Sequence, residues 1–313
     1  MKVLRLSTPV PEACRGGVIA IGNFDGVHQG HRALMNRVRN LAAAEGRPAG
    51  ALTFEPHPRE FFASAAPPFR LTNFRAKAIS LCETGIDLMA VAPFGRALAT
   101  MSAEAFVDEV LCRRLGVAHV VVGYDFAFGH KRAGNVALLQ AMGAERGFQV
   151  SVIDPVRDGE EVFSSTRIRD ALWQGEPRRA ARLLGHPWEV HGRVRKGDQR
   201  GRTIGFPTAN VSLGGYLEPR LGVYAVRIGW DEDGGLVWHD GVANLGRRPT
   251  FNKTDVLLEV NVFDFAGDLY GRHVRVGFVD FIRPEQKFDG LDALKAQIQA
   301  DAGRAREILS RAD

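Results

Sequence analysis

The pattern of hydrophobic and polar positions divides the chain into two halves of different character. Between about residues 18 and 155, short β-branched runs alternate with segments of helical periodicity. The runs that predict strands are Val18 to Ile21, Ala49 to Phe54, Leu88 to Ala92, Val117 to Val122 and Phe148 to Ile153. Because such alternation is typical of a parallel sheet with crossover helices, the first half is expected to be an α/β domain.

Two of the segments between these strands show one apolar face. Leu34, Val38 and Leu41 share a helix face, and a second helix carries its apolar face at Phe106, Val110 and Leu115. Ser102 precedes that second helix as a candidate N-cap, and Gly116 follows it as a candidate terminator.

The second half has a different pattern. After the arginine-rich stretch from Glu176 to Arg182, Gly185-His186-Pro187 interrupts the chain, so domains are predicted at residues 1–184 and 185–313. Strand-like runs follow at Val190 to Val194, Val223 to Ile228, Leu236 to Val242, Leu257 to Phe263 and Val274 to Ile282. They predict a small antiparallel β-barrel. One amphipathic helix, Leu291 to Leu309, is expected to cover it with Leu291, Leu294, Ile298 and Ile308.

Composition excludes several classes of protein. With 313 residues, 45% hydrophobic and 25% charged, the chain is too apolar to be disordered and long enough for two domains. Cys14, Cys82 and Cys112 are odd in number and widely spaced, which fits neither a disulfide framework nor a paired zinc site. The first 17 residues hold no unbroken apolar run of signal-peptide length, and no run elsewhere approaches the ~20 apolar residues needed to span a bilayer, so neither export nor membrane anchoring is expected. A cytoplasmic protein is expected.

The formal net charge of +5 comes from basic residues in short clusters among glycines. These clusters are interpreted mainly as candidate anion sites, although a solvated basic surface is the default interpretation for any single cluster.

The first candidate for chemistry is the segment from Ile19 to His31, which runs from a predicted strand through glycines into a predicted helix. Gly22, Gly26 and Gly30 would let the backbone approach a phosphate, and the helix N-terminus favours negative charge. His28 and His31 would stabilise charge on a leaving pyrophosphate. The alternative is a glycine-rich turn with two surface histidines. Neither a Walker A loop nor a dinucleotide fingerprint is present.

This segment resembles the HxGH-type nucleotidyltransferases, and nearly the whole chain resembles the bacterial bifunctional riboflavin kinase/FMN adenylyltransferase (FAD synthetase) family. Four more segments carry the likeness in the same order: Thr53 to Pro58, Met101 to Phe106, Gly123 to Gly129 and Ser164 to Arg169. The resemblance implies a Rossmann-like α/β nucleotidyltransferase domain followed by a riboflavin kinase-like barrel with a C-terminal helix. It also implies attack of the FMN phosphate on the α-phosphorus of ATP, giving FAD and pyrophosphate.

Site residues of this first reaction follow from the resemblance. For ATP it implies Gly22, Phe24, Asp25, Gly26, His28, His31, Ser165, Thr166 and Arg169, and for the flavin Phe54, Asp125 and Phe128. Two hydroxyls and two arginines at the start of a helix suit the β and γ phosphates, although a capped helix with solvated arginines gives the same pattern. Asp125 could equally be a turn residue.

A second constellation lies in the barrel half. Residues 192–210 combine glycines with basic residues, and the resemblance implies ATP binding for the kinase reaction by Lys196, Gly197, Gly201, Gly205, Pro207, Thr208 and Asn210. In an extended segment Thr208 and Asn210 face one side and could hold Mg²⁺ with ATP oxygens. As a bare string, Pro207 to Asn210 is more typical of a strand entry or turn.

Glu259 is the candidate general base on the ribityl 5′-hydroxyl of riboflavin, by resemblance to the kinase segment. Strand alternation places Glu259, Asn261 and Phe263 on one face, with an exposed strand glutamate as the alternative. Many members of the family have histidine where this chain has Asn261, so no catalytic role is assigned there. Asn244 and Arg283 lie in matching segments and are expected to bind the flavin.

Two other functions remain open at this point. One keeps the HxGH fold with another acceptor, such as a nicotinamide or pantetheine phosphate, but the C-terminal motifs argue against it. The other is a nucleic-acid binding module of the OB type, which leaves Thr208, Asn210 and Glu259 unexplained. The expected substrates are therefore riboflavin, FMN and ATP, with Mg²⁺. No nucleic acid or membrane partner is expected, and the chain should be a monomer or weak homo-oligomer.

Overall fold

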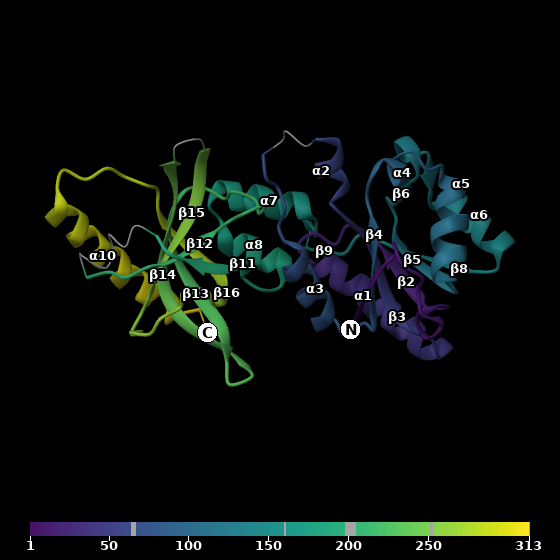
Figure 1. Ribbon diagram of the computed structural model, residues 1–313, viewed down its shortest axis with the longest axis horizontal. Helices are drawn as coiled ribbons and strands as arrows, with labels where there is room; N and C mark the ends of the chain where they lie inside the picture. The colour runs from purple at the N-terminus through teal and green to yellow at the C-terminus, as the bar shows by residue number, and fades with distance from the viewer. Residues whose placement is uncertain (64–66, 160, 198–204, 251–252, 313) are drawn as a thin grey trace. The chain divides into compact units, whose positions relative to one another are not determined.

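The computed structural model describes residues 1–63, 67–159, 161–197, 205–250 and 253–312. Its contacts divide the chain into two compact units (Figure 1). Unit 1 comprises Met1–Ala66 and Phe74–Ser164, and unit 2 comprises Pro67–Asn73 and Ser165–Asp313. The expected boundary after residue 184 falls inside unit 2, beyond helices α7 (Ser165–Gln174) and α8 (Pro177–Leu184). The division into domains at residue 184 therefore stays a prediction.

Unit 1 is built on one six-stranded sheet in which every pairing is parallel. Its spatial order is β1 (Lys2–Arg5), β4 (Leu88–Pro93), β3 (Ala49–Glu55), β2 (Val18–Ile21), β5 (His119–Gly123), β8 (Gln149–Ile153). All five predicted strands are confirmed. The edge strand β1 was missed, because its four residues hold only two apolar positions, between Lys2 and Arg5, and give no β-branched run.

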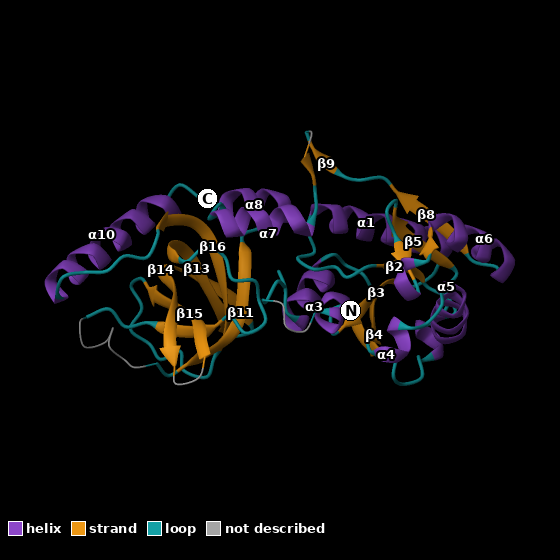
Figure 2. Cartoon of the chain, turned by 90° about the horizontal axis from the view of Figure 1, so that it is seen from above, coloured by secondary structure: helices purple, strands orange, loops and turns teal. Residues whose placement is uncertain are grey.

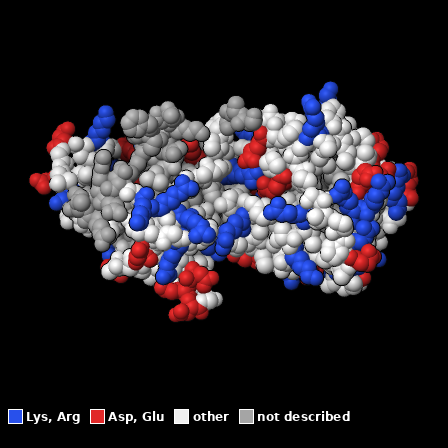
Figure 3. Space-filling model, in the orientation of Figure 1, with Lys and Arg blue, Asp and Glu red and all other residues white. Residues whose placement is uncertain are grey.

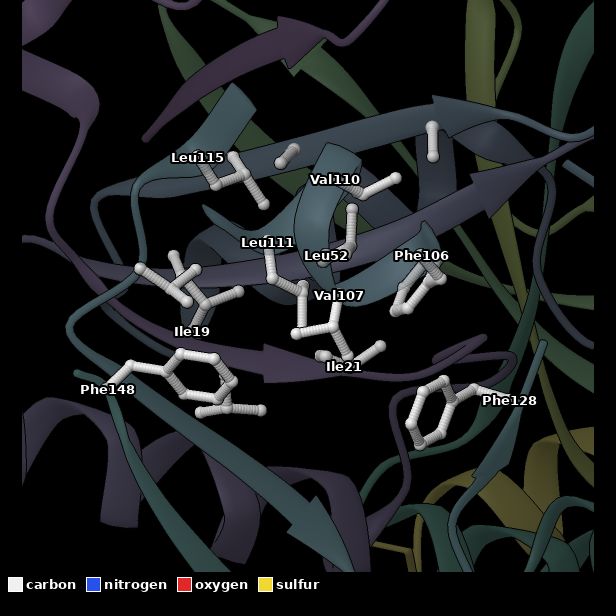
Figure 4. Packing of buried hydrophobic residues seen from close by; sticks show 14 of the residues in the cluster. Ile19, Ile21, Leu52, Phe106, Val107, Val110, Leu111, Leu115, Phe128 and Phe148 are labelled. Atoms are coloured by element: carbon white, nitrogen blue, oxygen red, sulfur yellow. The ribbon is translucent and has the colours of Figure 1, made fainter. Parts of the chain in front are cut away.

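Helices cover both faces of this sheet (Figure 2). On one face α1 (Gln29–Glu45) and α3 (Phe74–Glu83) pack with Met35, Val38 and Leu81. On the other, α5 (Ala103–Ala105), the π-helical η2 (Phe106–Leu115) and α6 (Val136–Arg146) pack against Ile19, Ile21 and Leu52 (Figure 4). The remaining short elements are η1 (Glu12–Cys14), α2 (Pro58–Phe62), α4 (Arg96–Ala99), β6 (Ala127–Phe128), η3 (His130–Arg132), β7 (Gly134–Asn135), β9 (Arg157–Asp158) and β10 (Glu161–Val162).

Both predicted helix signals around the second helix are confirmed. The Ser102 hydroxyl accepts a hydrogen bond from the backbone N–H of Ala105 at 3.1 Å. Gly116 ends the helix with φ of 56°, in the left-handed region that glycine adopts without steric cost.

The strand order reverses next to β2. From β2 the chain continues through β3 and β4 on one side, and then returns to place β5 on the other side. In an open parallel sheet, ligands bind outside the carboxyl ends of the strands at such a switch point. The residues that leave β2, β3 and β5 at that edge are therefore the first place to look for a site.

Unit 2 contains a closed antiparallel barrel of six strands. They run in the order β11 (Trp188–Arg195), β12 (Ala209–Ser212), β15 (Lys253–Val262), β14 (Gly235–Thr250), β13 (Gly222–Glu232), β16 (His273–Arg283). Helix α10 (Leu291–Leu309) has the predicted bounds and packs on the barrel through Ala305, Ile308 and Leu309. Its fully buried apolar side chains lie in the C-terminal half, while Leu294 and Ile298 are half-buried. Leu291, expected to contact the barrel, is 53% exposed.

On the face drawn in Figure 3, lysine and arginine side chains form several separate groups among the acidic ones. Among the residues described, no helix has both the length and the apolar character that crossing a membrane requires.

Candidate active sites

The loop of residues 22–28, between β2 and α1, has an unusual backbone. Phe24, Gly26 and Val27 all have positive φ, at 49°, 87° and 41°. For a β-branched residue such as Val27 this conformation is a rare and costly one, and such strain concentrates at functional sites. The hydroxyl of Thr53 on β3 donates to the carbonyl oxygen of Asn23 at 3.2 Å, which ties the loop to the neighbouring strand.

His28 is the N-cap of α1. Its Nδ1 accepts a hydrogen bond from the backbone N–H of His31 at 3.4 Å, so the ring hydrogen is assigned to Nε2. The two imidazoles are stacked, with centroids 3.7 Å apart and planes 21° apart. The sequence prediction that His28 and His31 lie together at the start of the helix is confirmed, although the helix begins at Gln29 rather than near His31.

The pKa of His31 is lowered well below its ordinary value of 6.5. Burial is the largest cause, followed by the charges of His28 and Lys77. The Nδ1 atom of His31 is buried and has no hydrogen-bond partner among the described residues. A neutral imidazole with an unsatisfied nitrogen at a helix N-terminus is suited to a ligand that carries oxygen atoms.

Lys77 on α3 is the residue of this region that sequence reasoning missed. Its side chain is 1% exposed, and its Nζ donates to the Glu55 carboxylate at 3.0 Å and to Thr53 Oγ1 at 3.5 Å. A lysine is usually solvated, so nothing in its identity predicted burial. A weak signal was present in the helical spacing, because Lys77 shares a face with the buried Ser80 and Leu81.

The residues predicted to contact the flavin lie around the adjoining strand ends. Phe54 on β3 and Phe128 on β6 both lie against Phe106, at centroid distances of 6.4 and 5.6 Å. Phe128 is a core residue, 7% exposed. Asp125 is exposed in the turn after β5, where Phe126 N–H bonds the Gly123 carbonyl at 3.1 Å. Its contact with flavin stays a prediction.

Ser165, Thr166 and Arg169 belong to helix α7 of unit 2. Arg169 is buried, its Nε donates to the Phe69 carbonyl at 2.9 Å, and its guanidinium lies 5.4 Å from the Phe69 ring. The proposed binding of ATP by these three residues stays a prediction.

In unit 2 the barrel register brings three candidate residues into one row. Asn210 on β12 pairs with Glu259 on β15, and Glu259 pairs with Asn244 on β14. Directly opposed residues on neighbouring strands project to the same face, so the three side chains share one side of the sheet. Leu258 and Val260, which flank Glu259, are fully buried in the core. The predicted face of Glu259 is thus opposite to that of its hydrophobic neighbours.

Asn210 has an orphaned oxygen. The residue is 5% exposed, its Nδ2 donates to the Thr208 carbonyl at 3.4 Å, and its Oδ1 is buried without a hydrogen-bond partner among the described residues. A buried amide oxygen without a partner is costly unless a ligand satisfies it. Carbonyl and hydroxyl oxygens are the ligands Mg²⁺ accepts, so Asn210 and Thr208 fit the predicted metal.

The glycine-rich segment of residues 192–210 approaches the row of Asn210, Glu259 and Asn244 at Gly197. A Cβ on Gly197 would lie 2.6 Å from Asn210 Nδ2, so a side chain at this position would force the Asn210 amide to move. Gly205 has φ of 89°, and the Pro207 carbonyl accepts a hydrogen bond from Asn261 Nδ2 at 2.8 Å. Lys196 Nζ lies 5.9 Å from the Tyr270 ring. Gly201 lies outside the described residues.

Arg283, predicted to bind flavin, is held by α10. Its Nε lies 2.9 Å from Asp301 Oδ1 and its Nη2 lies 2.7 Å from Asp301 Oδ2, while Nη1 donates to the Pro284 carbonyl at 2.9 Å. The structure therefore gives Arg283 a role in attaching the helix, and its contact with flavin stays a prediction.

A strained loop at a helix N-terminus in the α/β unit, and a carboxylate beside a side-chain amide on the barrel, are features that suit a transferase acting on phosphates. Comparisons with known proteins specify the class further. The family model for FAD synthetase matches residues 10–167, and that for riboflavin kinase matches residues 184–309. These two matches follow the order of the two candidate sites.

Full-length relatives agree. The bifunctional riboflavin kinase/FMN adenylyltransferase of Escherichia coli (strain K12) is 43% identical over 312 residues, covering 98% of each chain. That of Pseudomonas fluorescens is 44% identical over 296 residues, covering 94% of this chain and 93% of the relative. The crystal structure of a macrolide-efflux protein from Streptococcus pneumoniae has a TM-score of 0.85 and 29% identity, covering 97% of this chain and 98% of that chain. Its name refers to efflux, whereas the family models and the curated relatives agree on flavin chemistry.

The chain belongs to the family of bifunctional riboflavin kinase/FMN adenylyltransferases. It is an enzyme of flavin cofactor synthesis, with the adenylyltransferase activity in the N-terminal region and the riboflavin kinase activity in the C-terminal region. ATP is the co-substrate and flavins are the substrates. The alternatives of another acceptor or a nucleic-acid module are not supported by these matches.

Proposed function

We propose that riboflavin is phosphorylated at the row formed by Asn210, Glu259 and Asn244 on the barrel. Glu259 takes the proton from the 5′-hydroxyl of riboflavin while the hydroxyl oxygen attacks the γ-phosphorus of ATP, releasing ADP and leaving FMN. The observation that carries this proposal is the strand register, which places a half-buried carboxylate directly beside an amide with an unsatisfied buried oxygen. Asn244 and Arg283 are proposed to bind the flavin.

Mg²⁺ is proposed to be held by Thr208 and Asn210, where it would neutralise charge on the ATP phosphates. The unsatisfied Oδ1 of Asn210 supports this assignment. Lys196, Gly197, Gly201, Gly205 and Pro207 are proposed to surround the same nucleotide, and the close approach of Gly197 to Asn210 supports the placement of that segment.

FMN is proposed to be adenylylated at the loop of residues 22–28. A phosphate oxygen of FMN attacks the α-phosphorus of ATP, and pyrophosphate leaves. His28 and His31 donate hydrogen bonds to phosphate oxygens as charge builds up, and the N-terminus of α1 favours the same charge. The attacking phosphate is already an anion, so no histidine has to act as nucleophile. The stacked rings and the unsatisfied His31 Nδ1 support this role.

The remaining residues complete this proposal. Gly22, Phe24, Asp25 and Gly26 belong to the loop that would contact ATP, with Phe54, Asp125 and Phe128 toward the flavin. Thr53 fixes the loop through Asn23, and Lys77 lies behind it beside Glu55. A cytoplasmic location is proposed because the reaction consumes ATP and because Cys14, Cys82 and Cys112 are free thiols.

Chromatography of the purified chain with ATP tests the proposal. Riboflavin should yield FMN and then FAD, and FMN in a parallel reaction should yield FAD, both only when Mg²⁺ is present. If FAD forms from FMN but no FMN forms from riboflavin, the kinase reaction proposed for the barrel is wrong. Full activity in the presence of EDTA would show that the proposed Mg²⁺ is not required.

A further inference from the structure

A gap in strand pairing precedes the segment that carries Thr208. The β12–β15 ladder runs from Ser212↔Leu257 to Ala209↔Val260 and ends there. Continued in register, it would next reach Thr208 and then Pro207. Pro207 has no backbone N–H, so it cannot donate to a neighbouring strand. The ladder alone therefore does not fix the backbone that leads into Thr208.

The side chain of Asn261 fills this gap. Its Nδ2 donates to the Pro207 carbonyl oxygen at 2.8 Å, from the next residue of β15 beyond Val260. Side chains alternate along a strand, so Asn261 lies on the same face as Glu259. One face of β15 thus carries the proposed general base and, two residues later, a donor that holds the segment opposite.

The consequence for the site follows from peptide geometry. The Pro207 carbonyl belongs to the rigid peptide plane that ends at the Thr208 nitrogen, so fixing it fixes the entry of the chain into Thr208. The Thr208 carbonyl then accepts from Asn210 Nδ2 at 3.4 Å, and this bond turns the opposite atom, Oδ1, into its unsatisfied position. The side-chain amides of Asn261 and Asn210 thus position the two proposed metal ligands, Thr208 and Asn210.

We infer that Asn261 is a positioning residue of the kinase reaction, whose amide holds Pro207 so that Thr208 and Asn210 meet the magnesium-bound nucleotide. This inference rests on the function proposed above for Thr208 and Asn210. Asn261 takes no part in proton transfer. Its required property is a hydrogen-bond donor at this point of the strand, which a histidine ring N–H also provides and which aspartate and leucine lack.

Steady-state kinetics of the full-length chain tests the inference. Asn261→Asp and Asn261→Leu differ in charge and share only the loss of the donor. Both should raise the KM for Mg-ATP in FMN formation roughly tenfold, the value of about one lost hydrogen bond, with a small change in the KM for riboflavin. Asn261→His should stay within about threefold of the parent chain. FAD formation from FMN, measured on the same preparations, should be unchanged.

Asn73→Asp is the matched control. Asn73 Nδ2 also donates to a backbone carbonyl in unit 2, that of His191 at 3.3 Å, on a different strand from the one that Asn261 supports. If the Asn261 variants lose thermal stability as this control does while keeping the parent KM for Mg-ATP, the role is structural and the inference is wrong. The inference is also wrong if Asn261→His is as impaired as Asn261→Leu.

Asn210→Ala and Glu259→Gln separate the inference from the function beneath it. If these two variants abolish FMN formation while Asn261→Leu has the parent KM, the inference fails and the proposed site stands. If FMN formation survives in Asn210→Ala and Glu259→Gln, the proposed site itself fails and the inference falls with it.

Discussion

The imidazole rings of His28 and His31 lie face to face, 3.7 Å apart, at the first turn of α1. Two protonated rings at this distance would repel each other, and the helix N-terminus disfavours positive charge as well. His31 is therefore favoured in its neutral state beside His28, which suits the role proposed above for it as a hydrogen-bond donor to phosphate oxygens.

His31 should remain neutral at and below pH 6.5. Its pKa in the folded chain lies well below 6.5, through burial first and then the charges of His28 and Lys77. In the unfolded chain the ring titrates near 6.5, so the stability linked to it is full above that pH and declines as the pH falls. An NMR titration of His31, assigned by comparison with His31→Gln, should show no midpoint between pH 6.5 and 8. A midpoint at or above about 6.5 would contradict this account.

The two roles of His28 can be separated. His28→Asn keeps an N-cap acceptor and loses the ring, so thermal stability should change little while FAD formation falls by roughly a hundredfold or more. His28→Ala should lose the activity and also about 1 kcal/mol of stability, because it removes the cap. Thermal melts and rates of FAD formation provide the measurements. Retained activity in His28→Asn would show that only the cap matters.

In unit 1, the sequence predicted what depends on local chemistry. The five predicted strands, the Ser102 cap, the Gly116 terminator and the pairing of two histidines at a strand-to-helix loop all depend on short segments, and all are confirmed. Lys77 was not predicted. Its burial depends on Glu55, which is close in the fold and distant in the chain, and only the tertiary structure brings the two charges together.

Gly197 should tolerate no side chain. A methyl group there would lie 2.6 Å from Asn210 Nδ2 and displace an amide that has little room to move. Gly197→Ala is expected to raise the KM for ATP in FMN formation by roughly tenfold and leave FAD formation from FMN unchanged. Gly215→Ala is the control, because a Cβ there meets nothing within 4 Å. Equal kinetics for the two variants would mean that Gly197 does not support the nucleotide site.

Glu189 should govern the acid stability of unit 2. Burial raises its pKa, but hydrogen bonds from His191 and Arg275 outweigh that effect and lower it from 4.5 to about 2. Because the folded pKa is depressed, the stabilisation is complete above pH 4.5 and is lost as the pH falls toward 2. It amounts to something on the order of 3 kcal/mol. Glu189→Gln should remove much of this stabilisation at neutral pH. It should also flatten the pH dependence of the free energy of unfolding below pH 4.5.

Tryptophan fluorescence measures this unit selectively. All four tryptophans lie in unit 2, and Trp188 and Trp230 are buried in the barrel. Glu218→Gln is the control, since Glu218 pairs with the exposed Arg247 at 3.0 Å and such surface pairs contribute less than about 1 kcal/mol. If Glu189→Gln is no less stable than Glu218→Gln at pH 7, the buried cluster does not act as described.

In the barrel, alternation in the sequence correctly predicted the face of Glu259. The β-branched runs predicted five of the six strands. Strand β12 was not predicted as a strand, because Pro207 and Asn210 are typical of turns. The row of Asn210, Glu259 and Asn244 needs the register of three strands, which no local pattern contains. The pairing of Arg283 with Asp301 likewise depends on how α10 packs on the barrel.

The central claim is that two reactions occur at two separate groups of residues in one chain. The most direct test is chromatography of the products of His31→Gln and Glu259→Gln, each given riboflavin or FMN with Mg-ATP. The account predicts that His31→Gln forms FMN from riboflavin and no FAD from FMN, whereas Glu259→Gln forms FAD from FMN and no FMN from riboflavin. Loss of both products in both variants would contradict two independent sites, and parent activity in either variant would contradict the role given to that residue.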